Sequence, residues 1–317
     1  GGTALTELTM GSIVKMVEFN SAHYAVSDTG VWKRSADAWA WVGGSPPGIT
    51  DAFISADSTY LVLCRGSSLV YWLMRTGESF LITSSTAAGS KIQKGLAVNA
   101  LDYGTLDNNT VYKIGALLTS TVTTTYTVVD TGGTFTGIVD HVVASVAAPF
   151  IFKTNGAYYI NSTGSVIEVL KAVIKPNTNA NTGKNAIAWY GADAEIIYIP
   201  YGAGAGLLTY DEGIGPALGA DVYAKRLSNF TGQVVATAAD DQYLYLIQDS
   251  GSTIEIIKAR YEVIAGASTW VMHPFKQDTY ATCVGAFISS LTAKRLYYFG
   301  GSSVIPKYIP LSTKYGD

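Results

Sequence analysis

The sequence is poor in charge and has no long apolar run. Charged residues make up 14% of the 317 positions, well below the roughly 25% of an average soluble domain. The 15 lysines and 6 arginines form no dense run, so the sequence lacks the cluster of basic residues that is typical of a nucleic-acid-binding protein. No stretch of about 18 apolar residues occurs, and no basic segment precedes an apolar one near the N-terminus. We therefore expect no nucleic-acid partner, no membrane insertion and no signal peptide.

Cysteine is scarce as well. Cys64 and Cys283 are too few for a disulfide framework, and neither belongs to a CxxC pair of the kind that holds zinc or does redox work. We expect both to be small buried side chains. Two such side chains leave the redox compartment open. The absence of a signal peptide says little about location, because a mature fragment or a domain cut from a longer chain also lacks one.

Apolar residues are abundant and evenly spread. They make up 48% of the chain, and tyrosine, valine, isoleucine and threonine occur along its whole length, which favours a large β-rich core over disorder. The stretch 236–256, "ATAADDQYLYLIQDSGSTIEI", shows the local plan: a strand end, a small polar bend, an apolar strand, a Gly/Ser turn and another strand. This plan recurs along the chain.

Seven copies of the plan are recognisable. We take the first residue of the second strand in each copy as its anchor, which gives Tyr24, Tyr60, Val111, Phe150, Ile196, Tyr243 and Leu296. The mean spacing is about 45 residues, close to the length of a four-stranded propeller blade. The spacing is uneven, which variable loops on a fixed strand plan explain. The third copy is the least regular.

The copy around Asp240 can be divided into four strands. We predict them at 233–239, 243–248, 252–260 and 268–274, each rich in β-branched or aromatic residues. Tyr245 and Leu246 should point to opposite faces, and both faces are apolar. Such a sheet is covered on both sides, as a blade between two other blades is.

The two ends of the chain suggest how a ring closes. The last copy lacks an outer strand, and the alternating segment Ala4–Met10 has no copy of its own. We expect this segment to supply the missing strand, which removes an exposed sheet edge.

These repeats resemble the β-propeller superfamily. The resemblance covers the whole chain and implies an all-β fold, a seven-bladed β-propeller of four-stranded antiparallel blades in one domain, 1–317, as part of a longer polypeptide. Six blades are the alternative, and a β-sandwich or a β-solenoid is a lesser one. The segment 31–43, "VWKRSADAWAWVG", also resembles a degenerate Asp-box, with Ser35, Asp37 and Trp41 in place. In sialidase-type propellers that box is a fold-stabilising hairpin away from the active site.

Chemical motifs are weak throughout. Asp240 and Asp241 are adjacent on the chain, so they are poorly placed as a glycosidase pair, and we interpret them as a solvated bend with local hydrogen bonds. Their replacement by asparagine should change stability only modestly. The three histidines lack metal-ligand spacing, and no GxSxG or Walker motif occurs. The six arginines fall mostly in turn or outer-strand segments, which weakens a sialidase hypothesis. We predict no catalytic residue, metal or cofactor.

A binding site is expected on the long loops instead. We interpret the segment from Asp211 as a connection between successive blades, on the face of the second-to-third strand turns, where function concentrates on variable loops. Its ligand-binding candidates are Asp211, Glu212, Tyr223, Lys225 and Arg226.

The expected function follows from the amino-acid composition and from one C-terminal segment, and not from catalytic motifs. Low charge, abundant Gly, Ser, Thr and Tyr, and the C-terminal segment "YYFGGSSVIPKYIPLSTKYGD" resemble propeller domains of bacteriophage virion proteins. That resemblance implies a non-catalytic structural or adhesion module, extracellular or in a virion, whose partner is a neighbouring protein or a surface glycan. The alternative is a glycan-cleaving hydrolase or lyase on the same scaffold.

Overall fold

The computed structural model describes residues 10–311 with internal gaps. The segments outside the description are 1–9, 37, 67–69, 85–91, 107–108, 119–120, 129–131, 144–145, 170–182, 192–193, 201–206, 212–223, 226–232, 281, 290, 292, 302–304 and 312–317. The described residues form 27 β-strands and no helix. The all-β prediction is confirmed. In the part of the chain described, no helix has the length and apolar character needed to cross a membrane.

The strands group into seven antiparallel sheets, numbered here in chain order. Sheet 1 has β1 (Ile13–Phe19), β2 (Ala22–Ser27), β3 (Gly30–Ser35) and β4 (Ala38–Trp41). Sheet 2 has β5 (Asp51–Ile54), β6 (Tyr60–Cys64), β7 (Val70–Arg75) and β8 (Phe80–Ser84). Sheet 3 has β9 (Ile92–Val98), β10 (Leu101–Leu106), β11 (Thr110–Ala116) and β12 (Thr121–Thr127).

The second half of the chain repeats this order. Sheet 4 has β13 (Phe135–Val143), β14 (Val146–Lys153), β15 (Gly156–Ile160) and β16 (Val166–Val169). Sheet 5 has β17 (Ile187–Gly191), β18 (Ala194–Pro200), β19 (Leu207–Asp211) and β20 (Ala224–Lys225). Sheet 6 has β21 (Gln233–Ala239), β22 (Leu244–Asp249), β23 (Thr253–Ile264) and β24 (Ala267–Thr279). Sheet 7 has β25 (Cys283–Ser289), β26 (Arg295–Gly300) and β27 (Lys307–Pro310).

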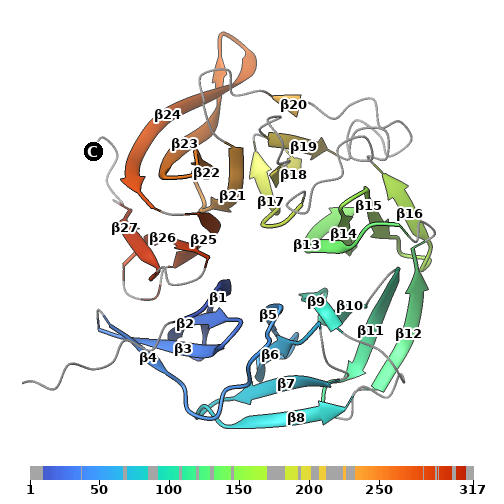
Figure 1. The fold of residues 1–317 in the computed structure, drawn as a ribbon. Coiled ribbons are helices and arrows are strands. Elements are labelled where there is room, and N and C mark those ends of the chain that lie inside the picture. The colour runs from blue at the N-terminus through green and yellow to red at the C-terminus, as the bar shows by residue number, and fades with distance from the viewer. Residues whose placement is uncertain are drawn as a thin grey trace, which may run out of the picture.

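The seven sheets stand around a common centre, with the first strand of each sheet innermost (Figure 1). Each first strand contacts the first strand of the next sheet, and β25 contacts β1, so the contacts run all the way round the ring. Seven blades is our interpretation of these seven sheets. Within every sheet the strands alternate in direction, so two kinds of connection share one face of the ring: first-to-second strand and third-to-fourth strand. We call this the bend face.

Both faces of each sheet are buried between neighbours, as sheet 6 shows. Leu244 and Leu246 of β22 pack with Tyr198 of sheet 5, whereas Tyr245 and Ile247 pack with sheet 7. Alternation along a strand puts successive side chains on opposite faces, so a strand covered on both sides is apolar at most positions. The predicted division of this copy into four strands is confirmed, although β23 and β24 are longer than predicted.

The strand assignment of the third copy was wrong by one strand. Val111 lies on β11, the third strand of sheet 3, and the second strand is β10. The bend between β9 and β10 is Asn99–Ala100, with φ of 47° and 58°. An alanine in the left-handed region gives little sequence signal, so the later polar segment around Asn109 had the stronger appearance of a bend.

Sheet 1 packs directly against sheet 7 and closes the ring. Met10 and Trp32 share a buried cluster with Tyr297 and Phe299 of β26. The predicted closing strand, Ala4–Met10, lies outside the described residues except for Met10, so the donation of a fourth strand to sheet 7 stays a prediction.

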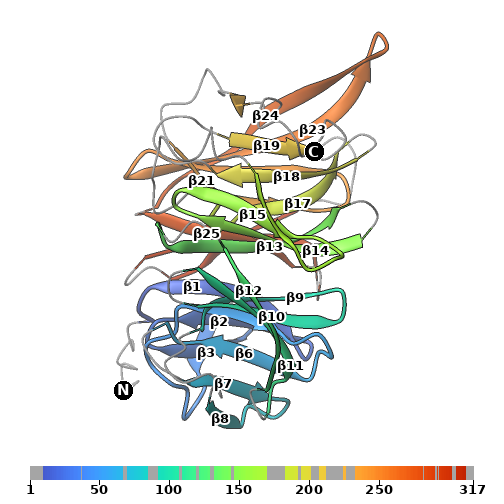
Figure 2. The ribbon, with the colours of Figure 1, turned by 90° about the vertical axis from the view of Figure 1, so that its right-hand side faces the viewer.

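One hairpin extends beyond the rest of the ring. β23 and β24 pair over their whole length, and their outer part projects past the neighbouring sheets (Figure 2). The turn is Ala265–Gly266, with φ of 53° and 80°. Two successive positive φ values are typical of a type I′ turn, whose twist matches that of the flanking strands.

Candidate functional site

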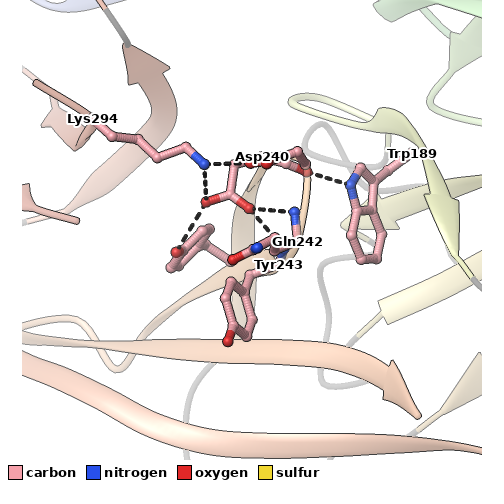
Figure 3. Close-up of polar contacts among 7 residues, drawn as sticks. Trp189, Asp240, Gln242, Tyr243 and Lys294 are labelled. Carbon is pink, nitrogen blue, oxygen red and sulfur yellow. Dashed lines mark hydrogen bonds and ion pairs between the residues drawn. The ribbon is translucent and has the colours of Figure 1, made fainter. Parts of the chain in front are cut away.

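The bend between β21 and β22 ties three sheets together through Asp240 (Figure 3). One carboxylate oxygen of Asp240 accepts hydrogen bonds from the backbone N–H groups of Gln242 and Tyr243, at 2.8 and 2.7 Å. Lys294 of sheet 7 lies 3.2 Å from the other oxygen, and the indole of Trp189 in sheet 5 donates to the Asp240 carbonyl at 2.6 Å. The bend therefore fixes the bend-face edges of sheets 5, 6 and 7.

Asp240 and Asp241 differ in exposure. The Asp240 side chain is 4% exposed and that of Asp241 is 73% exposed, and both bind Lys294. The expected local hydrogen bonds are confirmed, but a solvated bend describes Asp241 only. Hydrogen bonding from Lys294 lowers the pKa of the Asp241 carboxyl.

A pocket of about 620 Å³ opens on the bend face between sheets 1 and 7. Its floor and walls come from the β1–β2 bend, from β2 and β3, from the β3–β4 turn and from the start of β26. The described lining residues are Asn20, Ser21, Ala22, His23, Lys33, Arg34, Ala36, Leu291 and Arg295. Three of these side chains are cationic, and none of the described lining side chains is a carboxylate. We call it the cationic pocket.

Two arginines of the cationic pocket share one aromatic ring. The guanidinium carbons of Arg34 and Arg295 lie 4.6 and 4.5 Å from the ring centroid of Tyr308 on β27. Arg34 also donates to the carbonyl of Ala36 at 2.9 Å and to the hydroxyl of Tyr297. The contact with the ring and the two hydrogen bonds keep the Arg34 guanidinium group in a fixed orientation. The two arginines are far apart in sequence and come together where the first and last sheets meet.

His23 links the two sheets at the edge of the cationic pocket. Its Nε2 atom bonds the hydroxyl of Ser289 at the end of β25, and the same nitrogen lies 3.6 Å from a carboxylate oxygen of Glu18. Burial lowers the pKa of His23, Glu18 raises it, and the charges of Arg34 and Arg295 lower it further. In a catalytic triad the carboxylate holds the other ring nitrogen. This Ser–His–Glu group lacks that arrangement.

A second pocket, of about 330 Å³, lies on the same face between sheets 2 and 3. Its lining combines Asp57 and Asp102 with apolar side chains of β10 and β11 and of the β11–β12 connection. Burial raises the pKa of Asp102 to about 6, the N–H donated by Ala56 at 2.8 Å lowers it, and the charge of Asp57 raises it. The pKa of Asp57 is lowered, chiefly by the hydrogen bond from Ser55.

The predicted binding residues are divided between described and undescribed segments. Asp211 ends β19 and pairs with Ile196, whereas Lys225 on β20 pairs with Leu207 at the other end of β19. Glu212, Tyr223 and Arg226 lie outside the described residues. Asp211 ends the third strand of sheet 5 and so lies at the bend face, not at the opposite face expected for the connection that starts there, and 212–223 lie outside the described residues. A binding role for these five residues stays a prediction.

The other histidines and the cysteines lie away from both pockets. His141 is buried against the rings of Phe150 and Tyr210, and His273 lies on β24. Within the described ranges, no three His, Cys, Asp or Glu side chains gather as metal ligands would. Cys64 and Cys283 are free and buried, as predicted, and burial raises the pKa of the Cys283 thiol to about 12. The Asp-box segment is the β3–β4 hairpin, in which Ser35 pairs with Ala38.

No family model matches the sequence, and no curated protein matches it either. Solved structures do resemble it. Virginiamycin B lyase from Staphylococcus aureus is 11% identical, with a TM-score of 0.67 and 96% of each chain covered. The Cps50 (Swd1) β-propeller domain of Myceliophteria thermophila is 12% identical, with a TM-score of 0.56 over 93% of this chain and 96% of that one.

A chain in the mitotic checkpoint complex is 9% identical and has a TM-score of 0.61, with 98% of this chain and 95% of that chain covered. At such identities the likeness shows the fold alone. The fold is a β-propeller of antiparallel sheets. Its structural neighbours include an enzyme, the lyase, and a chain of a protein complex, so the scaffold by itself does not select a function.

Proposed function

We propose that the protein is a non-catalytic binding module of a larger assembly and that it presents its bend face to a partner. The observation that carries this proposal is the cationic pocket, whose polar lining is held in place by bonds between sheets 1 and 7. His23 bonds Ser289, and Arg34 bonds Tyr297, across the contact between these two sheets. A preformed pocket on a rigid scaffold is suited to binding, because little ordering entropy is lost when a partner is held.

The chemistry at the pocket favours binding over turnover. Glu18 approaches the same ring nitrogen of His23 that already bonds the Ser289 hydroxyl. A general base of the triad type needs the carboxylate on the other nitrogen. The likeness to virginiamycin B lyase is one of fold, so it supports a glycan-cleaving or other lyase activity no further than any propeller does.

The sequence resemblance to virion propellers also supports a proposal about where the protein acts. We propose that the assembly is a virion or another extracellular structure and that the partner is a neighbouring protein or a surface glycan. A propeller chain in the mitotic checkpoint complex illustrates a protein partner for this fold. Asp211, the last residue of β19, lies at the same face as the cationic pocket.

The test combines binding with a search for products. The intact protein is applied to an array of acidic and neutral glycans and to a pull-down from disrupted virions, and bound glycans are then analysed by mass spectrometry for shortened or unsaturated products. We expect reproducible binding and intact glycans. Release of soluble products from a bound glycan would move the protein to the alternative class of glycan-cleaving enzymes.

A further inference from the structure

The pocket between sheets 2 and 3 holds negative charge with no cation beside it. We call it the acidic pocket, because its described lining contains the carboxylates of Asp57 and Asp102 and no lysine, arginine or histidine. Within the described part of the chain neither carboxylate forms an ion pair, and the charge that acts on Asp102 is the like charge of Asp57. Two carboxylates that repel each other at one pocket favour the entry of a cation.

Hydrogen bonds hold both carboxylates at the acidic pocket. Oδ1 of Asp57 accepts from the hydroxyl of Ser55 at 2.6 Å and from the backbone N–H of Thr59 at 2.9 Å. Oδ1 of Asp102 accepts from the backbone N–H of Ala56 at 2.8 Å, and no described group donates to its Oδ2 atom. A ligand that donates to Asp102 therefore meets an oxygen that is already in place.

Tyr60 brings a third oxygen to the acidic pocket. Its side chain is 9% exposed, belongs to the buried cluster between sheets 2 and 3, and lines the pocket. The hydroxyl of Tyr60 has no hydrogen-bond partner among the described residues. A buried tyrosine hydroxyl usually has such a partner. The structure therefore leaves one buried polar group at this pocket for a ligand to satisfy.

The rest of the lining selects the kind of cation. Leu101, Ile114, Leu117 and Leu118 give the acidic pocket an apolar wall, and Leu118 is 50% exposed. Calcium takes roughly six to eight oxygen ligands, and two carboxylates beside an apolar wall do not provide them. A primary alkylammonium group has three N–H donors and no acceptor, and it carries an apolar stem. The volume of about 330 Å³ is in the range of small-ligand pockets.

We propose that the acidic pocket binds a primary alkylammonium group, which donates to the carboxylates of Asp57 and Asp102 and packs its alkyl stem against Leu117 and Leu118. The hydroxyl of Tyr60 accepts the third N–H. A lysine side chain of a partner and a free alkylamine share this chemistry. The site goes beyond the proposed function, because it is a second pocket on the bend face and does not depend on what the cationic pocket binds.

The acidic pocket should bind the ammonium group in a pH-dependent way. Burial raises the pKa of Asp102 to about 6, and the titratable groups that line the pocket with it are Asp57 and Tyr60. A bound ammonium group favours the ionised carboxylate and so lowers the pKa of Asp102. By linkage, binding weakens as the pH falls through 6.

The experiment is an NMR titration of the intact, isotope-labelled protein at pH 7.5. The probe is hexylammonium chloride, and hexanol is the uncharged ligand of the same length. We expect hexylammonium to bind at least tenfold more tightly than hexanol, and Asp102→Asn to weaken it about tenfold, since a lost charge-assisted hydrogen bond has this order of effect. Asp241→Asn is the control variant, because it makes the same change in net charge at an exposed position outside the pocket. Its affinity should equal that of the unmodified protein.

Two further readouts separate local binding from a change in structure. Asp102→Asn removes a partly buried charge, so its melting temperature at pH 7.5 should not fall, and weaker binding by this variant is not a result of unfolding. The unmodified protein should also bind hexylammonium more weakly at pH 5 than at pH 7.5. Full affinity in Asp102→Asn, equal binding of hexanol, or equal affinity at the two pH values would overturn the site.

A second pair of probes identifies the source of the ammonium group. A capped tripeptide with a central lysine is compared with the same tripeptide acetylated on the lysine side chain. Binding of the unacetylated peptide alone would support a lysine of a protein partner, whereas binding of hexylammonium without either peptide would support a free alkylamine. Binding of magnesium chloride that displaces hexylammonium would assign the acidic pocket to an inorganic cation and overturn the alkylammonium proposal.

Discussion

Asp240 and Asp241 illustrate how neighbouring residues of the same type take different roles. The Asp240 carboxylate accepts from two backbone N–H groups and from the hydroxyl of Tyr245, and it lies beside Lys294. Asp241 meets Lys294 from the solvent side. Replacement of a buried carboxylate that accepts several hydrogen bonds lowers the free energy of unfolding. Each donor that loses its acceptor stays removed from water without a hydrogen bond in exchange.

We expect Asp240→Asn to lower the free energy of unfolding by about 1–3 kcal/mol, since the amide presents donors to Lys294 and Tyr245 in place of an acceptor. Urea unfolding measures the change. The matched control is Asp241→Asn, for which a change within about 0.5 kcal/mol is expected at this exposed side chain. Equal effects of the two substitutions would contradict the role assigned to Asp240. The sequence predicts a modest effect when both aspartates are replaced, and the structure leads us to predict a modest effect for Asp241 only.

Asp102 gives the molecule a pH dependence of unusual sign for a carboxyl. Its pKa is raised from 3.8 to about 6, first by burial, so between these values the folded state holds a proton that the unfolded chain has released. The stability contributed by Asp102 therefore falls as the pH rises through this interval. We expect Asp102→Asn to remove this fall and to raise the stability at pH 7 by on the order of 1 kcal/mol, a value reduced for partial solvent exposure.

The measurement is thermal unfolding of both proteins at a series of pH values from 4 to 8. Asp57→Asn serves as the contrast, because the pKa of Asp57 is lowered, chiefly by the Ser55 hydroxyl. Its stabilising effect is present at neutral pH and is lost as the pH falls, so this variant should be less stable at pH 7. A parallel pH profile for Asp102→Asn and the unmodified protein would refute the raised pKa.

At the scale of strands and sheets, packing between blades depends on small residues at a few inner positions. Gly95 lies on β9, where a Cβ atom would come 2.2 Å from the ring of Phe53 on β5 of the neighbouring sheet. Contacts between β5 and β9 form part of the inner ring. A side chain at Gly95 must therefore push two sheets apart or turn the Phe53 ring.

Gly95→Ala should lower the free energy of unfolding by about 1–3 kcal/mol, which is typical of overpacking. Thermal or urea unfolding is again the measurement. Gly43→Ala is the matched control, because nothing lies within 4 Å of a Cβ atom at Gly43 and its φ is not in the left-handed region. Similar losses in both variants would show that the close approach to Phe53 is unimportant.

The whole ring depends on the contact between its first and last sheets. Sheet 7 has three strands within the described residues, and β27 lies at its outer edge. The cluster of Met10, Trp32, Tyr297 and Phe299 holds sheet 1 against it. An uncovered outer edge would expose unpaired backbone N–H and C=O groups to other molecules.

Deletion of residues 1–9 tests whether the N-terminal segment pairs with sheet 7, and it keeps Met10 in its cluster. We expect the truncated protein to aggregate and to melt at a lower temperature. Size-exclusion chromatography measures the aggregation, and calorimetry measures the melting temperature. Deletion of 312–317 is the matched truncation at the other terminus and should leave both unchanged. A monomeric 1–9 deletion with an unaltered melting temperature would exclude strand donation by this segment.

Periodicity in the sequence determined the all-β class, the recurrence of a four-strand plan and the burial of both faces of each sheet. These properties depend on local sequence, because residues only a few positions apart form both the alternation along a strand and the polar turn that follows it. The same local information misplaced the second strand of sheet 3, where the Asn99–Ala100 bend is less conspicuous than the later polar segment.

The cationic pocket was decided by the tertiary structure alone. Arg34 and Arg295 come from the first and last sheets, and closure of the ring places both against Tyr308. Glu18, His23 and Ser289 meet for the same reason. No local pattern encodes such meetings, because they depend on which sheets become neighbours and on the register of each strand relative to the bend face. The sequence by itself determined what kind of sheet each segment builds, and closure of the ring decided which side chains meet.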